Sequence, residues 1–313
     1  MGKHIGIDVG GTTIKAGITD ERGNILHRLT IPTDVDTGFE KIALNMVNMT
    51  KKLLDSSSTD ISEIRNIGIG IPGIADKNGK VYFATNLFWK NVELGKVFKE
   101  NFPNIEIKVD NDATVAAIAE QFVGSIKGVQ NAVMLTLGTG VGGGIMINGL
   151  KYSGHSNIGS EIGHMVIGEK STYRCACGRD GCFETYCSAT GVIRYAQKLI
   201  NDGEKSILAF GKSIDEIDAE AIFDGYVQKD EVCVKTVKRF VNYFSIGIAN
   251  IVNILDPEYI VIGGGMSNSF DLYIDDLNRL VSEKVMVKDV PFAKIVKAEL
   301  GNDAGIIGAA MLK

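Results

Sequence analysis

A strand that ends in a glycine-rich turn occurs twice in this sequence, and the duplication constrains the fold more than any other feature. In the first copy, residues 5–18, Gly10 and Gly11 separate two apolar segments. The second copy, residues 132–147, follows roughly 130 residues later, a spacing far too long for a solenoid repeat. A chain of 313 residues has room for about two domains. The sequence therefore predicts two related α/β halves.

Strand and helix patterns alternate along the rest of the chain. Short apolar runs that end at turn residues predict strands at 25–31, 67–71, 105–109 and 259–262. Apolar stripes and end signals predict helices at 39–54, 112–122, 231–255 and 303–312. These elements together indicate an α/β class.

Charge and composition exclude several kinds of protein. The chain has 33 Lys and Arg against 38 Asp and Glu, a net charge of −5, so we expect no nucleic-acid partner. The apolar runs are far shorter than the ~20 residues that span a bilayer, and the N-terminus lacks the apolar core of a signal peptide. The five cysteines are odd in number, which argues against a disulfide framework. We therefore expect a cytoplasmic protein that binds no membrane.

Three glycine clusters each follow a strand. Glycine lets backbone N–H groups approach an anion, and threonine or lysine adds donors, although a single such cluster is more often a plain hairpin turn. Neither a P-loop nor a dinucleotide-binding spacing occurs at the first cluster. Three clusters in one chain favour phosphate binding. Their candidate residues are Asp8, Gly10, Gly11, Thr12, Thr13 and Lys15; Gly138, Thr139, Gly140 and Gly142; and Gly263, Gly264 and Gly265.

The segment 110–114 closes a strand and opens a helix. Asp112 has two interpretations: it caps the helix, or it projects from the carboxyl end of a strand into a ligand crevice. In the second case it can accept a proton from a substrate hydroxyl. Asn111 offers both a hydrogen-bond donor and an acceptor.

The strongest chemical signal lies between residues 161 and 184. Cys175, Cys177 and Cys182 stand within eight residues, and His164 precedes them. Three thiols and an imidazole are the ligand set of a tetrahedral Zn²⁺, and four protein ligands leave no open position, so the metal would be structural. The alternative is ordinary buried thiols. Cys187 and Cys233 have no partner in spacing and are expected in the core.

Glu161 and Glu184 flank these metal ligands, and carboxylates can hold sugar hydroxyls. Without the metal, each would more plausibly be a solvated surface residue. Two weaker segments are 70–73, which includes Gly73, and 86–89, where Trp89 is either a sugar-binding wall or a core residue.

Taken together, these motifs resemble the ROK sugar kinases (repressor, open reading frame, kinase), and most closely the zinc-containing bacterial glucokinases. The resemblance covers essentially the whole chain. The combination of Glu-x-Gly-His at 161–164 with Cys-x-Cys-Gly-x2-Gly-Cys-x-Glu at 175–184 is highly specific. The sequence departs from the usual family pattern at Thr85 and Thr114, which bears on sugar preference rather than on the reaction.

The resemblance implies an actin-like (ribonuclease H-like) ATPase fold, with two lobes and a ligand cleft between them. The small lobe would comprise 1–113 and 298–313, and the large lobe 114–297 with the zinc-binding loop. It also implies ATP, Mg²⁺ that Asp8 helps to place, structural Zn²⁺ and a homodimer.

The same resemblance assigns the site. Asp112 would be the general base, His164 would bind both zinc and sugar, and the three glycine clusters would hold ATP. The sugar-binding residues would be Gly73, Asn86, Asn111, Asp112, Glu161, His164 and Glu184.

The expected reaction is ATP-dependent phosphorylation of D-glucose at its 6-hydroxyl. The alternatives are kinases for N-acetylmannosamine, N-acetylglucosamine, fructose, allose or a β-glucoside. A sugar-responsive transcriptional regulator is a more remote alternative, because such members carry a helix-turn-helix domain ahead of the sugar domain, whereas the phosphate motif here starts at Asp8.

Overall fold

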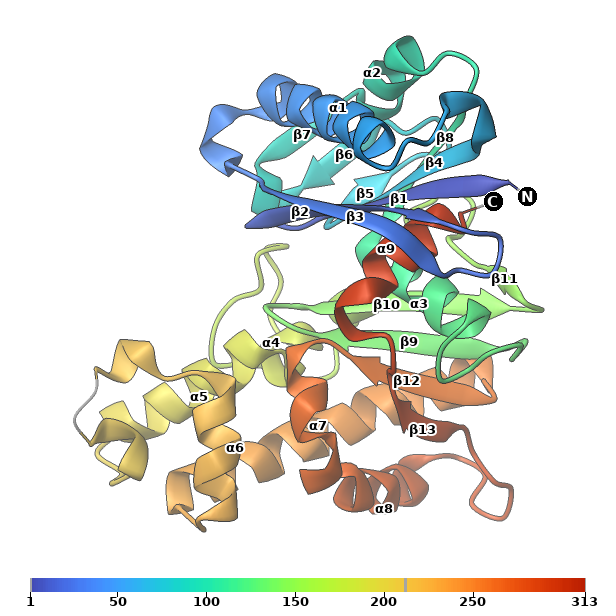
Figure 1. Ribbon diagram of the computed structural model, residues 1–313. Coiled ribbons are helices and arrows are strands. Elements are labelled where there is room, and N and C mark those ends of the chain that lie inside the picture. Colours follow the sequence, from blue (N-terminus) through green and yellow to red (C-terminus); the bar gives the residue numbers. More distant parts are fainter. Residues whose placement is uncertain (1, 211–212, 313) are drawn as a thin grey trace. The chain divides into compact units, whose positions relative to one another are not determined.

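The computed structural model describes residues 2–210 and 213–312, and the chain divides into two compact units (Figure 1). The first unit comprises the chain up to residue 130, residues 144–160, and the chain from 299 onward. The second comprises residues 131–143 and 161–298. Packing thus groups 114–130 and 144–160 with the first unit. The expected boundaries of the two functional lobes, 1–113 plus 298–313 and 114–297, remain a prediction.

The first unit is built on a mixed sheet with the strand order β3-β2-β1-β4-β8. β1 is antiparallel to β2 and parallel to β4, which is parallel to β8. Ile5 on β1 pairs with Ile18 on one side and with Ile67 on the other, and all three side chains are fully buried. The bounds are β1 Lys3–Val9, β2 Thr13–Thr19, β3 Ile25–Pro32, β4 Ile64–Ile71 and β8 Glu106–Asn111.

Helices cover both faces of this sheet (Figure 1). α1 packs on β2 and β3, α2 on β8, and α9 on β1, β4 and α3. Gly6 and Gly68 permit the close approach of α9, because an added Cβ would lie 1.9 Å from the Ile306 carbonyl oxygen and 1.8 Å from that of Ala309. The bounds are α1 Phe39–Ser56, α2 Leu94–Asn101, α3 Asp112–Phe122 and α9 Ala304–Ala310.

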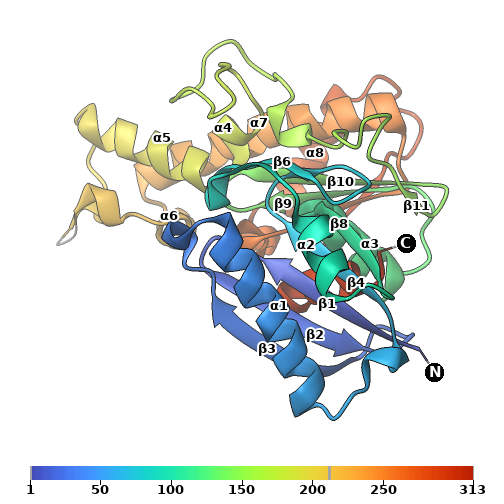
Figure 2. The same ribbon diagram turned by 90° about the horizontal axis from the view of Figure 1, so that it is seen from above.

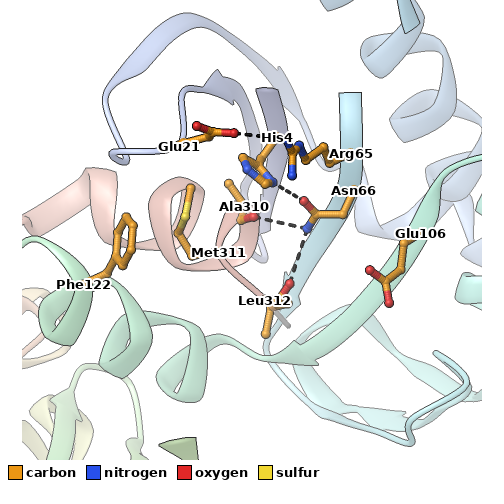
Figure 3. A pocket seen from close by; sticks show the side chains of 9 residues that line it. All are labelled: His4, Glu21, Arg65, Asn66, Glu106, Phe122, Ala310, Met311 and Leu312. Carbon is orange, nitrogen blue, oxygen red and sulfur yellow. Dashed lines mark hydrogen bonds and ion pairs between the residues drawn. The ribbon is translucent and has the colours of Figure 1, made fainter. Parts of the chain in front are cut away.

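Hydrogen bonds attach the end of α9 to the amino-terminal edge of this sheet (Figure 3). The buried Asn66 side chain donates hydrogen bonds through its amide nitrogen to the carbonyl oxygens of Ala310 (3.1 Å) and Leu312 (3.4 Å), and its amide oxygen accepts from His4 Nδ1. These residues line a cavity of about 400 Å³, together with Arg65 and others. The cavity lies at the start of β1 and β4, away from the carboxyl ends of these strands.

A small antiparallel sheet, β5-β6-β7, which was not predicted from the sequence, also belongs to the first unit, as do β11 and the part of β10 from Gly144 onward. Trp89 on β7 is only 4% exposed and meets Phe39 edge to face at 5.2 Å, so it is a core residue and not a wall of a site. The bounds are β5 Ile74–Ala75, β6 Val81–Ala84, β7 Trp89–Val92, β10 Val141–Ile147 and β11 Leu150–Lys151.

The second unit joins parallel strands to a helical layer. β12 lies between β9 and β13, with Ile260 paired to Val133 and Ile295. The long helix α7 packs on α4, α5, α6 and α8 (Figure 2). Its residues coincide with the predicted helix 231–255. The bounds are β9 Ala132–Leu137, β12 Tyr259–Gly263, β13 Lys294–Lys297, α4 Glu184–Cys187, α5 Ala189–Asn201, α6 Ala219–Val227, α7 Glu231–Leu255 and α8 Ile274–Lys284.

Short 3-10 helices connect several of these elements. They are Val35–Thr37, Ile61–Glu63, Thr85–Leu87, Ile162–His164, Ile207–Ala209, Ile214–Glu216, Gly265–Leu272 and Gly301–Asp303. Cys187 and Cys233 are fully buried, as expected for core residues. Within the described part of the chain, none of the helices combines the length and apolar character needed to cross a membrane.

Candidate active site

The carboxyl ends of three neighbouring parallel strands lie at one edge of the first unit's sheet. Asp8 on β1 pairs with Gly70 on β4, and Gly70 pairs with Asp110 on β8. In open α/β sheets, ligands bind outside this edge. The register therefore brings the first glycine cluster and the segment 110–112 to the same edge, as the sequence analysis expected.

Asn111, not Asp112, caps helix α3. The Asn111 side-chain oxygen accepts from the backbone N–H groups of Ala113 (2.9 Å) and Thr114 (3.3 Å). The capping interpretation of Asp112 is therefore wrong: Asp112 is the first residue of α3, and its exposed side chain accepts from Ala113 N–H at 2.8 Å. The exposed Asp112 carboxylate therefore lies just beyond the carboxyl end of β8, where it can contact a ligand.

Gly73 and Asn86 lie close to the same edge. The Asn111 amide donates to the Gly73 carbonyl oxygen at 3.1 Å. Asn86 is exposed, and its Cβ and carbonyl oxygen would be 3.8 Å from a Cβ added to Gly11. Within the first unit, the structure therefore brings four of the predicted sugar-binding residues, Asp112 included, near the first glycine turn or the start of α3.

The first glycine turn is a tight connection between β1 and β2. Gly10 N–H donates to the Thr13 carbonyl oxygen at 2.9 Å, and Thr33 N–H donates to that of Thr12. Lys15 leaves the turn on β2 and donates to the Asn302 side chain at 3.3 Å. Burial raises the pKa of the Asp8 carboxyl, and the positive charge of Lys15 opposes this effect.

Lys151 is a residue that the sequence analysis missed. Its ammonium group forms an ion pair with the carboxylate of Asp110, which is 3% exposed and also accepts from Asn111 N–H at 2.8 Å. A buried charge needs a partner. The ion pair therefore holds the end of β8 in place just before Asp112. An aspartate at the end of an apolar strand is the sequence signal that could have suggested a basic partner.

In the second unit, the predicted metal ligands converge. One ligand atom each from His164, Cys175, Cys177 and Cys182 lies within 4.8 Å of the others. The Cys177 and Cys182 sulfurs are 3.6 Å apart, and Cys175 Sγ is 3.5 Å from His164 Nδ1. Zn–S bonds of about 2.3 Å span such separations. Three thiols and one imidazole at this spacing fit a tetrahedral Zn²⁺ ion.

The three thiols differ in how readily they ionise. Burial and the neighbouring Glu184 raise the pKa of Cys175, and burial together with Cys177 raises that of Cys182. Burial also opposes ionisation of Cys177, but hydrogen bonds from Arg179 outweigh it and lower the pKa of this thiol to about 6. Cys177 is therefore the thiol best prepared to bind a cation as a thiolate.

The His164 ring lies between two carboxylates. Its Nδ1 atom, on the cysteine side, is 3.8 Å from Glu184, and its Nε2 atom is 3.9 Å from Glu161. Partial burial raises the pKa of Glu161, the positive form of His164 opposes this rise, and Glu184 adds to it. The arrangement leaves Nδ1 for a metal and turns Nε2 toward Glu161, so one ring can serve both the metal and a polar ligand.

The second glycine turn lies against Glu184. A Cβ added to Gly140 would be 2.6 Å from Glu184 Oε2, and Gly138 accepts a backbone hydrogen bond from Ala189 at 2.8 Å. Gly142 lies inside β10 and not in the turn, because the strand begins at Val141. The turn thus joins the predicted phosphate-binding and sugar-binding residues of this unit.

The third glycine cluster is adjacent to the second. Gly264 has φ 79°, and an added Cβ would lie 2.5 Å from the Leu137 carbonyl oxygen at the end of β9. A Cβ on Gly138 or Gly265 would meet nothing within 4 Å. Both turns follow neighbouring parallel strands and present open backbone, as a phosphate-binding edge requires.

Comparison with known proteins agrees with the sequence resemblance. The model of the ROK family matches residues 4–313. This chain belongs to the ROK family. A glucokinase from Halalkalibacterium halodurans is 34% identical over 311 residues, which cover 99% of this chain and 94% of that protein. An N-acetyl-D-glucosamine kinase from Aliivibrio salmonicida is 31% identical and covers 99% of each chain.

A solved structure of a ROK family glucokinase from Streptomyces griseus, in complex with glucose and AMPPNP, is also similar. It has a TM-score of 0.82 and 30% sequence identity, with 99% of this chain and 98% of that chain covered. ROK sugar kinases have the actin-like, two-lobe ATPase fold, so the predicted fold class is confirmed. The comparisons support a ROK sugar kinase that binds ATP.

Proposed function

We propose that this protein transfers a phosphoryl group from ATP to the 6-hydroxyl of D-glucose. The observation that carries the proposal is the convergence of Glu161, His164 and Glu184 beside the glycine turn at 138–140. The similarity to a glucokinase that was crystallised with glucose and AMPPNP, an analogue of ATP, supports glucose as the sugar and ATP as the nucleotide.

Asp112 is the general base of the proposed reaction. A positioned carboxylate can accept the hydroxyl proton as the oxygen attacks phosphorus, and the protein otherwise contributes positioning and charge stabilisation. Asn111 supports this residue from the preceding position, because its own side chain caps α3 and bonds to Gly73. The base is thereby held at a fixed place on a helix that starts at the sheet edge.

In this proposal, polar side chains near the start of α3 and polar side chains around His164 recognise the sugar. Carboxylates accept hydrogen bonds from sugar hydroxyls, and amide and imidazole groups both donate and accept. We assign sugar binding to the side chains of Asn86, Asn111, Asp112, Glu161, His164 and Glu184 and to the backbone of Gly73, with the glycine clusters binding ATP through backbone N–H groups.

We also propose that His164, Cys175, Cys177 and Cys182 bind a structural Zn²⁺ ion. When bound, the ion supplies a fixed tetrahedral link between the loop at 164 and the loop at 175–182. Metal binding at such a site contributes to folding, so the ion would stiffen the loops that carry Glu161 and Glu184.

Mg²⁺ is proposed to accompany ATP, with Asp8 helping to hold it at the end of β1. Mg²⁺ prefers oxygen ligands and commonly uses one or two carboxylates together with nucleotide phosphates.

We further propose that the enzyme is a homodimer, as the family resemblance implies. Sedimentation of the purified protein tests this last point directly, because a monomer at micromolar concentration contradicts it.

A coupled assay of ADP formation over a panel of hexoses, with ATP and Mg²⁺, tests the proposed function. We expect kcat/KM for glucose to be among the highest on the panel. The Asp112→Asn variant is the matched control, because it removes the carboxylate charge but keeps the size of the side chain. A wild-type enzyme with no glucose activity, or an Asp112→Asn variant with normal turnover, contradicts the proposal.

N-acetylglucosamine is the second candidate substrate. The N-acetyl-D-glucosamine kinase that is 31% identical to this chain favours it. The two sugars differ at the 2-position, where one has a hydroxyl and the other an acetamido group. The same panel separates them: a kcat/KM for N-acetylglucosamine well above that for glucose would assign the protein to the second activity.

A further inference from the structure

Helix α4, which carries Glu184, is too short to hold its own direction. It comprises the four residues Glu184–Cys187, whereas isolated helices below about 12 residues are marginal in water. The Glu184 carboxylate is 18% exposed and reaches toward His164. Its Oε1 atom accepts a hydrogen bond from the Cys175 thiol at 2.9 Å. The direction of the backbone that carries this carboxylate depends on the buried side chains that attach α4 to the rest of the second unit.

One attachment is aromatic and precedes Glu184. The Phe183 ring is fully buried and stacks on Phe244 of α7, with ring centroids 5.9 Å apart. Gly247, also on α7, makes room for it, since an added Cβ would lie 2.5 Å from the Phe183 ring. This contact holds the start of α4 against α7.

The second attachment follows Glu184 and is centred on an arginine. The Tyr186 ring is fully buried and stacks on Tyr243 of α7 at 3.9 Å. The Arg239 guanidinium carbon lies 4.9 Å from the Tyr186 ring centroid, 5.1 Å from that of Tyr243 and 4.2 Å from that of Tyr195 on α5. One guanidinium thus contacts rings from α4, α5 and α7, which we call the Arg239 cluster.

The Tyr186 hydroxyl does not explain how this ring is held. Its oxygen is buried and finds no hydrogen-bond partner among residues 2–210 and 213–312. A guanidinium over an aromatic face is attracted by the negative charge of that face, and the attraction grows as water is excluded. Tyr186 is therefore held by contacts of its ring with Arg239 and Tyr243, and not by its polar end.

We propose that Arg239 is a positioning residue that aims Glu184 at the sugar. The inference rests on the proposed function, because it concerns the same sugar-binding carboxylate. Arg239 acts through Tyr186, two residues beyond Glu184 on the single turn of α4. Loss of the guanidinium frees this end of α4, so the carboxylate no longer meets the sugar in a fixed direction.

The test compares Arg239→Met, which keeps much of the side-chain volume, with Arg239→Lys, which keeps the charge. Glucose KM, kcat, ATP KM, glucose affinity by calorimetry without nucleotide, zinc content and Tm are measured for each. We expect Arg239→Met to raise glucose KM and the glucose Kd about tenfold, a typical loss for a supporting residue, with kcat and ATP KM changed less than threefold. Arg239→Lys should recover most of the loss.

Two control variants separate positioning from general damage. Tyr186→Phe removes only the unpartnered hydroxyl and should leave glucose KM within twofold of wild type. Lys238→Met changes the exposed neighbour of Arg239 on α7 and should do the same. If Arg239→Met does not fold, Arg239→Gln, which also lacks the charge, takes its place: a rise of threefold or more in glucose KM supports the inference, and an unchanged glucose KM refutes it.

The results that overturn the inference are distinct from those that overturn the function. A wild-type protein that does not phosphorylate glucose refutes the proposed function. A wild-type glucokinase whose Arg239→Met variant has a lower Tm but an unchanged glucose KM refutes the positioning role. A higher glucose KM that accompanies loss of zinc also refutes it, because Arg239 would then be holding the metal loops.

Discussion

Replacing Gly140 by alanine should weaken glucose binding without disturbing the fold. The added Cβ would lie 2.6 Å from Glu184 Oε2, whereas ordinary contact begins at 3.4 Å. The carboxylate must therefore withdraw by roughly 0.8 Å, and misplacement of a positioned group by about 1 Å can cost on the order of 10²-fold. We expect kcat/KM for glucose to fall about 10- to 100-fold, which is ~1.4–2.7 kcal/mol of lost transition-state stabilisation.

Calorimetry of glucose binding without nucleotide isolates this effect, because Gly140 is also proposed to lie in the ATP site. Gly138→Ala is the matched control in the same turn, since its added Cβ meets nothing within 4 Å. Its glucose Kd should stay within twofold of wild type. The reasoning is refuted if Gly140→Ala binds glucose normally while Glu184→Gln does not, because Glu184 would then matter to the sugar without being in contact with Gly140.

Three further predictions concern the base, the metal and the fold. Asp112→Asn should lower kcat by about 10²–10⁴, the range for loss of a positioned general base, with near-normal glucose affinity by calorimetry. Purified protein should contain close to one zinc per chain by elemental analysis, and Cys177→Ser should lose zinc and lower Tm; full activity in excess chelator without zinc contradicts this. Glu120→Ala should lower the urea midpoint and reduce the free energy of unfolding by on the order of 3 kcal/mol, because its buried carboxylate accepts from Ser125, Glu299 and Leu300. An unchanged midpoint would show that these N–H groups find other partners.

Local signals in the sequence were sufficient to predict much of the first unit. Alternating apolar residues around Gly10 and Gly11 predicted the β1–β2 hairpin, and the long stripe from Glu231 to Leu255 predicted α7 with the same bounds. The cluster of His164 with Cys175, Cys177 and Cys182 could also be predicted from the sequence, because three cysteines within eight residues are already close in the chain. In each case the interaction that decides the structure is local or periodic.

The remaining features depend on contacts between residues that are distant in the chain. The β5–β7 sheet has short strands with little alternation, and its placement is set by packing such as that of Trp89 on Phe39. The pairing of Lys151 with Asp110 joins residues 41 positions apart. Such contacts produce no periodic pattern in the sequence, so the residues can be recognised as polar or aromatic but their contact partners cannot be predicted.

The position of α9 has a consequence for how the protein is made. This helix, at residues 304–310, covers Gly6 and Gly68, which lie on strands formed from the first 71 residues of the chain. During synthesis, that face of the sheet stays uncovered until residues 304–310 have left the ribosome. Since elongation proceeds at about 5–20 residues per second, the nascent sheet waits on the order of ten seconds or more for its cover. The first unit to be translated is thus among the last to be finished.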